Sequence, residues 1–323
     1  MNTLICVSSS GSGFRNLAME EVLLDRTRPE DAAVFFYVNR RAVIIGRNQN
    51  PWAECDLARM EEDGVQLVRR ISGGGAVYHD RGNLNYSFLM GKERYDPDAQ
   101  TELILSAVRA LGIPAERTGR NDLTAAGRKF SGQAFCDMGG RRLHHGTLLV
   151  SSELDRLERY LTVDERKLSF KGIRSVRSRV ENLSAFCPGL TVPDLLERLK
   201  EACRAAYGDC TELPEEALEG PELEERAERH ASFGWRLGKT PRFDQELSAR
   251  FAWGGVQLHL RFLDGRVEDL DVFTDAGDPD LSEKARRCLR GVRYRSEDLA
   301  GALRAAGDRC LDDLAEYLTD LRL

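Results

Sequence analysis

Apolar residues recur along the N-terminal part of the chain with two different periods. A four-residue spacing predicts a helix over residues 16–26, with Asn16 as its N-cap. Two runs rich in β-branched and aromatic residues follow at 34–38 and 42–45, and polar residues separate them. We therefore expect these two runs to form a β-hairpin.

The middle of the chain continues as a mixture of short strands and amphipathic helices. Further strands are predicted at residues 66–68, 85–90, 129–135 and 147–150, and helices at 101–111 and 194–207. A glycine directly after each of these two helices supplies an end signal. The stretch 211–229 is acidic and lacks a strong period, so it is predicted to be a surface excursion.

A new pattern begins near residue 246. Alternation over residues 256–262 predicts a half-buried strand, and Asp264-Gly265 is a tight turn before a partner strand at 267–273. Helices are predicted at 282–289, 296–305 and 311–321. A hairpin followed by helices indicates a small domain of its own, so we divide the chain into a first domain, 1–245, and a C-terminal domain, 246–323.

The composition excludes several classes of protein. Of the 323 residues, 41% are hydrophobic and 31% are charged, which favours a folded chain over a disordered one. The net charge of −6 argues against non-specific nucleic-acid binding. No apolar run has the length of a membrane span and the N-terminus lacks a signal-peptide pattern, so we expect a cytoplasmic protein without a membrane partner. The eight cysteines never form a C-x-x-C pair, which predicts reduced, mostly buried thiols.

The strongest chemical signal is the segment from Arg69 to Asp80, which contains Gly73-Gly74-Gly75. Glycines let a backbone approach a ligand closely and leave N–H groups for anionic oxygens, and the arginines before them can bind phosphate or carboxylate. Taken alone, the segment is equally a glycine-rich turn beside two solvated arginines. The chain has neither G-x-x-x-x-G-K-[ST] nor a G-x-G-x-x-G after a strand, so a nucleotide would be bound by another fold.

Three further clusters carry polar chemistry. Lys129 lies among glycines and small residues in a predicted strand, where it can point into a cleft or into solvent. His144 and His145 point to opposite faces of a strand and cannot hold one metal ion together, so we expect a structural role for at least one of them. Arginine recurs within residues 171–183, as in a solvated basic loop or a loop that closes over an anion.

Together these motifs resemble those of lipoate–protein ligases in their two-domain form. The resemblance rests on Arg69–Asp80 with Gly82-Asn83, GRNDL at 119–123, GRKFSGQA at 127–134, HHGTLL at 144–149 and KGIRSVRSRVENL at 171–183. It extends upstream to Asn16–Glu21 and IGRNQNPWAEC at 45–55, and downstream to 235–243 and FAWGGVQLHL at 251–260. It implies an α+β fold with a large mixed-sheet domain, like that of biotin–protein ligases and class II synthetases, and a small α+β C-terminal domain.

The resemblance also implies a reaction. Such ligases form lipoyl-AMP from lipoate, ATP and Mg²⁺, and then transfer the lipoyl group to a lysine of lipoyl domains. The acceptors are the acyltransferase subunits of 2-oxoacid dehydrogenases and the glycine-cleavage H protein. The small C-terminal domain resembles the one that moves between the two half-reactions.

Matching positions give the implied site residues. Lys129 is the electrostatic centre of the reaction, and the further ATP and adenylate contacts are Arg70, Gly73, Gly74, Gly75, Ala76, Val77, Tyr78, Asn83, Asn121 and Asp122. Lipoate contacts are Lys129, Arg70, Ser72, His79, Gly75, His145 and Val38. The loop that closes over the adenylate includes Lys171, Gly172, Ser175, Val176 and Arg177, and Asp122 is the implied Mg²⁺ ligand.

Several alternatives stay open. The chain could be an octanoyl or lipoyl transferase of the same superfamily that uses a ready-activated donor, or a binder of lipoyl domains without turnover. His79 is either a general base or a structural contact, and Cys136 is not expected to be a nucleophile. The apolar slot for the dithiolane tail is expected among Phe35, Tyr37, Val38, Val77 and Leu149. The preferred acid, the preferred acceptor and the oligomeric state are not determined by the sequence.

Overall fold

The computed structural model describes residues 2–119, 121–161, 180–240, 243–276, 278 and 280–323. The chain divides into two compact units, which are treated separately below. The first unit holds the described residues of 1–47, 65–158 and 176–231, and the second unit those of 48–64, 159–175 and 232–323.

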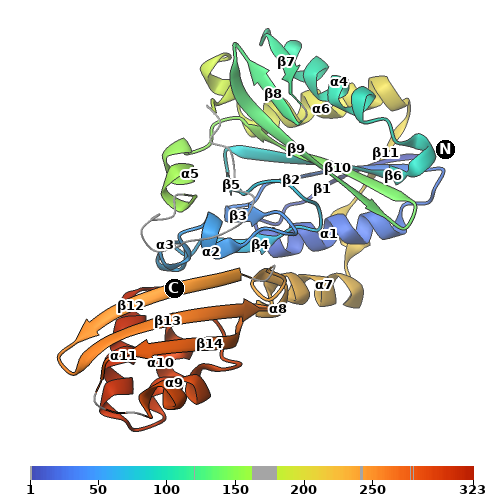
Figure 1. Cartoon of the computed structure of the whole chain (residues 1–323). Coiled ribbons are helices and arrows are strands. Elements are labelled where there is room, and N and C mark those ends of the chain that lie inside the picture. Colours follow the sequence, from blue (N-terminus) through green and yellow to red (C-terminus); the bar gives the residue numbers. More distant parts are fainter. Residues whose placement is uncertain (1, 120, 162–179, 241–242, 277, 279) are drawn as a thin grey trace. The chain divides into compact units, whose positions relative to one another are not determined.

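A mixed eight-stranded sheet forms the centre of the first unit (Figure 1). In spatial order its strands are β11 (Cys210–Leu213), β1 (Thr3–Val7), β2 (Ala32–Tyr37), β6 (Asn83–Gly91), β10 (Arg141–Leu149), β9 (Arg128–Met138), β8 (Asp122–Ala125) and β7 (Ala115–Thr118). β1 is parallel to both β11 and β2, and all the other neighbours are antiparallel. The strand at 3–7 was not predicted from the sequence.

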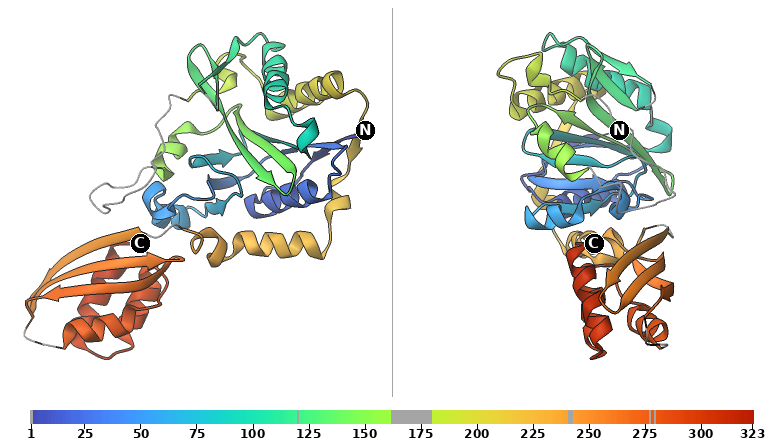
Figure 2. Two further views of the ribbon diagram at one scale, coloured as in Figure 1. Left: turned by 45° about the vertical axis from the view of Figure 1, so that its right-hand side comes forward. Right: turned by 60° about the vertical axis from the view of Figure 1, so that its left-hand side comes forward.

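Two helices cover one face of this sheet, as the views of Figures 1 and 2 show together. They are α4 (Pro97–Arg109) and α6 (Val192–Tyr207), and both confirm predicted helices. The side chain of Asp96 caps α4, and a capping box of Thr191 and Asp194 begins α6. Their apolar faces bury one continuous core with the strands, including Ile104, Leu199 and Phe88. This face of the sheet is therefore closed by hydrophobic packing.

The opposite face of the large sheet carries α1 (Gly13–Arg26) and a three-stranded sheet of β4 (Gln66–Arg69), β3 (Arg41–Ile45) and β5 (Val77–Asp80). α1 contacts strands of both sheets. Its N-cap is Ser12 and not Asn16, so that prediction is wrong. Asn16 is completely buried inside the helix, where its side chain donates to the carbonyl of Ser10 and to Asn39 Oδ1.

The hairpin predicted from 34–38 and 42–45 does not form. β2 pairs with β1 and β6 in the large sheet, whereas β3 pairs with β4 and β5 in the small one. The polar residues between them are not a free turn, because Asn39 is fully buried and hydrogen-bonded to Asn16 and His79. The two runs are adjacent in sequence but belong to the two sheets that face each other across α1.

The stretch 211–229 is ordered secondary structure and not a surface excursion, so that prediction is also wrong. It contains part of β11, the short 3₁₀ helix η4 (Glu215–Leu218) and most of α7 (Pro221–Ala231), which packs on α1. Its acidic residues pair with arginines of α1, as in Arg15 with Glu224 and Arg26 with Glu222. The apolar period is weak because the buried residues of α7 are a single leucine and a histidine, Leu223 and His230.

The second unit is a small α+β domain. Its antiparallel sheet has the order β12 (Phe243–Phe251), β13 (Gly254–Leu263) and β14 (Arg266–Thr274). The helices are α9 (Leu281–Leu289), α10 (Ser296–Arg304) and α11 (Arg309–Asp320), as predicted from the sequence apart from the end residues. Trp52 also belongs to this core, with its ring 5.4 Å from that of Phe243. The predicted boundary at 245/246 lies inside β12.

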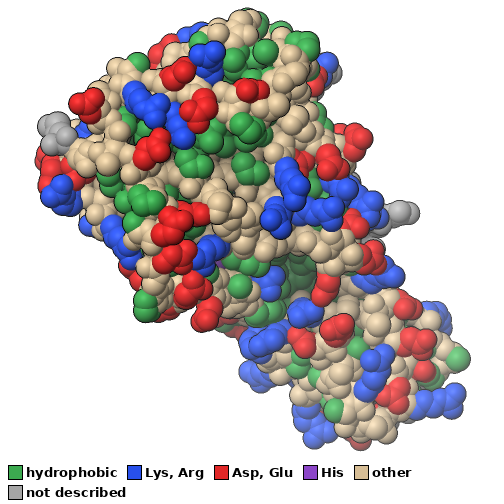
Figure 3. All heavy atoms as spheres, turned by 180° about the vertical axis from the view of Figure 1, so that it is seen from behind, with side chains coloured by type: hydrophobic (Ala, Val, Ile, Leu, Met, Phe, Trp, Pro, Cys, Tyr) green, Lys and Arg blue, Asp and Glu red, His purple; other side chains and the backbone are tan. Residues whose placement is uncertain are grey.

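The remaining short elements connect these layers. They are α2 (Pro51–Glu54), α3 (Leu57–Glu62), α5 (Leu154–Tyr160), α8 (Phe233–Arg236), and the 3₁₀ helices η1 (Lys92–Arg94) and η3 (Leu183–Ala185). Acidic and basic side chains are interspersed over the face of the molecule in Figure 3. Within the described part of the chain, no helix combines the length and the hydropathy needed to cross a membrane.

All eight cysteines are free thiols. Three are fully buried and five are only partly buried, so the prediction that most of the thiols are buried was wrong.

Candidate functional site

The turn between β4 and β5 is folded around the guanidinium group of Arg70. Nε donates to Ser72 Oγ and to the carbonyl of Gly73, both at 3.0 Å. Nη2 donates to the carbonyls of Gly73 and Gly75 at 2.6 and 2.9 Å, and Nη1 donates to that of Ile44 at 3.2 Å. Burial lowers the pKa of Arg70 to about 10, so the group stays charged at neutral pH. Arg70 is thus an internal clamp of the turn.

The glycine turn presents its amides outward. Gly73, Gly74 and Gly75 are exposed, and within the described residues their N–H groups have no hydrogen-bond partner. Gly74 has φ +95°, and a Cβ there would lie 2.8 Å from Arg70 Nη2. A Cβ at Gly46 would lie 2.2 Å from the Gly74 carbonyl oxygen, so the turn rests on the end of β3. Outward amides above a buried cation are suited to anionic oxygens.

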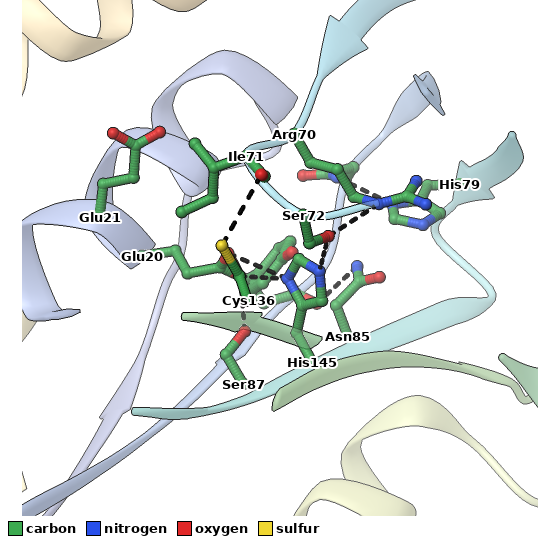
Figure 4. A network of polar contacts seen from close by, with 12 residues as sticks. Glu20, Glu21, Arg70, Ile71, Ser72, His79, Asn85, Ser87, Cys136 and His145 are labelled. Atoms are coloured by element: carbon green, nitrogen blue, oxygen red, sulfur yellow. Dashed lines mark hydrogen bonds and ion pairs between the residues drawn. The ribbon is translucent and has the colours of Figure 1, made fainter. Parts of the chain in front are cut away.

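A chain of buried polar groups continues from this clamp into the large sheet (Figure 4). Ser72 Oγ lies 2.6 Å from Nε2 of His145 on β10. Nδ1 of His145 lies 3.0 Å from both carboxylate oxygens of Glu20 on α1. Ser87 on β6 donates to Glu20 Oε1 at 2.7 Å. Both ring nitrogens of His145 are therefore occupied, so in this arrangement its ring can offer a ligand only carbon atoms.

Tyr37 of β2 borders the same network. Burial and the nearby charge of Glu20 raise its pKa well above the ordinary value, so the phenol is neutral. His144, the neighbour of His145, faces the other side of the sheet, where its ring lies 4.6 Å from that of Phe135 and Nδ1 is 2.8 Å from Gln100 Oε1. The expected split between the two histidines is confirmed, and His144 is structural.

His79 lies on β5 and is neutral, because burial and the charge of Arg70 lower its pKa to about 3. Asn39 Oδ1 accepts from Asn16, so the amide of Asn39 is the donor to Nδ1 of His79 at 3.0 Å. Its proton is then on Nε2, which is buried and has no partner among the described residues. In this tautomer Nε2 of His79 is a hydrogen-bond donor and does not accept a proton, which argues against the general-base alternative.

Asn83 and Asn85 line β6 on the same face as Ser87. Asn83 Nδ2 donates to Asn85 Oδ1 at 2.9 Å, and Asn85 Nδ2 donates to the carbonyl of Tyr37 at 3.1 Å. The Oδ1 atom of Asn83 is buried and has no partner in the described part of the chain. It is an acceptor that a bound ligand can satisfy.

Lys129 is positioned by an irregularity in β9. The pairing with β8 steps from Leu123↔Ser131 to Thr124↔Lys129, so Phe130 has no opposite residue in β8. Lys129 Nζ lies 2.9 Å from Asp122 Oδ1, and its side chain is 26% exposed. A Cβ at Gly132 would lie 3.4 Å from Nζ, so the lysine folds along the strand over a glycine. Lys129 is a half-buried, ion-paired cation.

The glycine turn reaches the same strand further along. A Cβ at Gly74 would lie 3.9 Å from Cβ of Ala134, five residues after Lys129. At about 3.3 Å per strand residue the two points on β9 are roughly 17 Å apart. Lys129 Nζ spans part of that interval, because it lies beside Gly132. The turn and the lysine thus lie along one strand, separated by a length that an extended ligand can occupy.

Asp122 is the first residue of β8, which pairs with the strand that carries Lys129, and Asn121 comes directly before it. Asn121 accepts the backbone N–H of Gln133 through its carbonyl at 2.8 Å, while its side-chain Oδ1 is buried without a described partner. Among the described residues no three His, Cys, Asp or Glu side chains form a metal site. One carboxylate still suits Mg²⁺, since this ion is commonly held by one or two carboxylates together with substrate phosphates. Asp122 fits that role, in competition with Lys129.

The other sequence-predicted residues are only partly brought together. Ala76 is half-buried at the start of β5, followed by Val77 (half-buried) and Tyr78 (buried). Val38 packs against the core beneath α4 and α6. The predicted closing loop, Lys171, Gly172, Ser175, Val176 and Arg177, lies outside the described residues.

The mixed sheet, the glycine turn and the small C-terminal unit define the class. Residues 12–204 match the family model "Lipoyl protein ligase A/B catalytic domain", and residues 240–316 match "Bacterial lipoate protein ligase C-terminus". The first match covers more than half of the chain. This chain therefore belongs to the lipoyl protein ligase A/B family, and it carries the C-terminal domain of bacterial lipoate protein ligases.

Solved structures agree with the family. Plasmodium falciparum LipL1 in complex with lipoate is 28% identical, with a TM-score of 0.67, and the match covers 99% of this chain and 100% of that one. A bipartite Thermoplasma acidophilum lipoate protein ligase, described with its E2 lipoyl domain, is 26% identical over 75% of this chain and 98% of that one, with a TM-score of 0.63. A lipoate-protein ligase A bound with ATP is 26% identical over 74% of this chain and 100% of that one, with a TM-score of 0.62.

Sequence reasoning missed Glu20 as a site residue. It lies within the Asn16–Glu21 segment of the family resemblance, but a glutamate on an amphipathic helix is usually solvated. Here Glu20 is 1% exposed and meets His145, 125 residues later in the chain. The available signal was the place of Glu20 among the apolar residues of the helix. In the structure Glu20 is buried together with Met19 and Leu23.

Proposed function

We propose that this protein activates lipoate with ATP, forming lipoyl-AMP and pyrophosphate, and then transfers the lipoyl group to a lysine of a lipoyl domain. The observation that carries the proposal is the arrangement along β9. The turn with three glycine amides that have no described partner approaches β9 at Ala134, and the half-buried Lys129 lies on the same strand, in a family whose solved members include complexes with lipoate and with ATP.

Adenylate formation requires cations and N–H donors close to the reacting groups. Joining a carboxylate to an α-phosphate brings two anions together, so the site must stabilise negative charge at contact distance. Lys129 is proposed as the catalytic residue, in contact with both the lipoate carboxylate and the adenylate phosphate. Its partner Asp122 holds the ammonium at 2.9 Å before substrates arrive and releases it to them. The glycine amides supply uncharged donors that need no counterion.

Arg70 has a different proposed role from the one that the resemblance implied. Its N–H groups are given to the turn, so it acts on the nucleotide through the shape of the turn and through its buried charge. The proposed ATP and adenylate contacts are Gly73, Gly74, Gly75, Ala76, Val77, Tyr78, Asn83, Asn121, Asp122 and Lys129, and Arg70 belongs to this site through the turn that it holds. The unpartnered Oδ1 of Asn83 supports adenine recognition, because it can accept from an exocyclic amine.

Lipoate is proposed to lie between the turn and β10. The proposed contacts are Lys129, Ser72, His79, Gly75, His145 and Val38, and Arg70 acts on lipoate through the turn. The Nε2–H of His79 supports this, because it is a buried donor without a described partner. Val38 is the weakest member, since it packs against the core beneath α4 and α6.

Further parts of the proposal concern the metal ion, the closing segment, the acceptor proteins and the C-terminal domain. Mg²⁺ would neutralise the triphosphate, with Asp122 as the protein ligand. The segment of Lys171, Gly172, Ser175, Val176 and Arg177 is proposed to close over the adenylate, which would protect a hydrolysable anhydride from water. Acyltransferase lipoyl domains and the glycine-cleavage H protein are the proposed acceptors, as the T. acidophilum structure with its lipoyl domain supports. Residues 246–323 are proposed to act as the accessory domain.

The transfer step needs orientation more than a general base. Aminolysis of a mixed anhydride is downhill, and holding the acceptor amine in line can contribute about 7–11 kcal/mol. The fixed tautomer of His79 is consistent with a reaction that proceeds without a base at this position.

The test is pyrophosphate release, measured with lipoate, with octanoate and without an acid, each with and without ATP. We expect release that requires both an acid and ATP. Lys129→Ala should abolish it while the far-UV circular dichroism spectrum is unchanged, whereas the matched control Arg128→Ala should retain it. Normal release by folded Lys129→Ala would remove this lysine from the reaction. Acyl transfer from a carrier without ATP would instead support a transferase.

A further inference from the structure

We propose that Glu20 and His145 are positioning residues, which act through Ser72 to hold Arg70 and the glycine turn in the form that binds the acid and the nucleotide. The proposal rests on the proposed function, because that function makes the turn a binding element. It adds Glu20, which acts at a distance from the substrates, and it gives His145, already a proposed lipoate contact, a second role behind the turn.

The hydrogen atoms in the chain can be placed in one consistent order. Arg70 Nε donates to Ser72 Oγ, so the serine accepts there and has its own proton to give. Ser72 Oγ can give it to Nε2 of His145 at 2.6 Å. Nδ1 of His145 then carries the ring proton and donates to Glu20 at 3.0 Å. The order requires a neutral imidazole with its proton on Nδ1, and the carboxylate selects that tautomer.

The two ends of the chain carry opposite charges. Burial lowers the pKa of Arg70, and the charge of the Glu20 carboxylate opposes this effect, whereas the Tyr37 phenol is neutral at this pH. Within the described residues Glu20 is thus the carboxylate that offsets the buried guanidinium. A buried cation without such a partner is strongly unfavourable, and the turn would rearrange to let water reach it. Glu20 therefore stabilises the clamped form through charge as well as through hydrogen bonds.

The network also joins three separate parts of the first unit. Glu20 comes from α1, His145 and Ser87 from β10 and β6 of the large sheet, and Ser72 from the turn of the small sheet. Three consecutive glycines give the turn high conformational freedom, so its shape depends on external contacts. Figure 4 shows the serine at the meeting point, between the guanidinium and the imidazole. Ser72 joins the clamp to His145 of the large sheet.

The adjacent residue on α1 provides a matched control. Glu21 is also buried, at 4%, and it also meets a histidine, His230 of α7, at 2.8 Å. It points away from the network in Figure 4 and has no described contact with the turn. Glu20→Gln and Glu21→Gln make the same chemical change in the same helix turn, so their difference reports the network and not the loss of a buried charge in general.

The experiment compares the full-length wild type with Glu20→Gln, Glu21→Gln, Ser72→Ala and Glu20→Asp. The first readout is hydrogen exchange without ligand at the backbone amides of Arg47 and Arg70, which donate to Ser72 and Ile45 and so report opening of the turn. We expect at least tenfold faster exchange in Glu20→Gln and Ser72→Ala, no change in Glu21→Gln, and partial recovery in Glu20→Asp, which retains the charge.

The second readout is kinetic. Glu20→Gln should raise the KM for lipoate and for ATP by tenfold or more while changing kcat by less than threefold, because the reacting groups at Lys129 are untouched. Glu21→Gln should change neither constant by more than twofold. Equal exchange rates and equal KM values in the two glutamine variants would overturn the proposal. If the wild type fails to release pyrophosphate, the proposed function fails, but the exchange experiment still decides whether the network holds the turn.

Discussion

Two consecutive glutamates on α1 make the same type of contact with two different neighbours of the helix. Glu20 meets His145 of the large sheet, and Glu21 meets His230 of α7, both in buried surroundings. Glu21 is additionally paired with Arg229 and Arg226, so its side is an ion-pair cluster between two helices. Glu20 instead passes its contact through Ser72 to a turn with three glycines. The same pair of residue types therefore fastens a helix in one place and a candidate binding element in the other.

The two contacts differ in the element at their far end, which is a regular helix for Glu21 and the glycine turn for Glu20. α7 is a regular helix with backbone hydrogen bonds of its own, so losing Glu21 should cost stability only. The glycine turn has no regular structure, and its form depends on Arg70 and the groups behind it. The comparison therefore separates effects on stability from effects on binding.

The largest expected effect is that of replacing Arg70, which lies at the end of the chain of contacts from Glu20. Arg70→Met removes the guanidinium group, which donates hydrogen bonds to three backbone carbonyls and to Ser72. The Ile44 carbonyl and Ser72 Oγ are the buried acceptors among these, and each one left without this donor costs about 1–3 kcal/mol, so we expect a loss of about 2–6 kcal/mol of unfolding free energy together with loss of ATP use. Urea unfolding and pyrophosphate release measure both. A stable Arg70→Met protein with weakened ATP use alone would mean that Arg70 contacts the nucleotide and does not hold the turn.

The second effect tests the Glu21 side. Glu21→Gln removes a charge that accepts hydrogen bonds from His230 and Arg229, and hydrogen bonds to charged groups contribute about 1.5–3 kcal/mol. We expect a loss of roughly 2 kcal/mol in urea unfolding, with the KM for lipoate unchanged. Arg26→Gln, whose partner Glu222 is 41% exposed, is the surface control and should cost less than about 1 kcal/mol. A changed KM in Glu21→Gln would show that the two sides are not independent.

The same carboxylate gives a pH dependence of defined sign. Burial alone would raise the pKa of Glu21, but the hydrogen bond and charge of His230 and the charge of Arg229 hold it below its ordinary 4.5. A lowered pKa in the folded state stabilises the fold above the unfolded-state value, and this contribution is lost as pH falls through the folded-state value. The difference in unfolding free energy between wild type and Glu21→Gln should therefore be full at pH 6–7 and shrink below about pH 4.5. A difference that grows on acidification would contradict this assignment.

A smaller effect distinguishes two neighbouring glycines. Gly74→Ala would place a Cβ at φ +95°, 2.8 Å from Arg70 Nη2, so we expect a loss of about 1–2 kcal/mol and a higher KM for ATP. Gly73→Ala meets no atom within 4 Å and its φ lies outside the left-handed region, so it should be close to neutral in stability. Thermal unfolding of the two variants compares them directly. Equal losses would show that the turn is not held against Arg70.

The sequence predicted the two halves of this comparison unequally. The glycine turn with Arg70, and separately Lys129 among its glycines, were selected because each short segment carries distinctive residue types. The helices over the closed face were found because their apolar residues keep a helical period, as in α4 and α6. The small domain followed from strict alternation along β13 and a tight turn at Asp264-Gly265.

What the sequence did not predict depends on contacts between distant residues. β2 and β3 looked like a hairpin because strand period carries no information on which sheet a strand joins. α7 looked like a loop because its buried side is Leu223 and His230, and the histidine is buried through Glu21. Glu20 and His145 are 125 positions apart, so the link between them appears only once α1 is packed on the large sheet.

The smallest expected effect is the sharpest test of independence. The double variant Glu20→Gln/Glu21→Gln combines neighbouring residues that share no described partner. If the two sides are separate, the losses of unfolding free energy should add within about 0.5 kcal/mol in urea unfolding, as for independent sites. A coupling above about 1 kcal/mol would mean that α1 shifts as one body between the two histidines. In that case α7 would influence the glycine turn through the helix, and Glu21 could no longer serve as a control for Glu20.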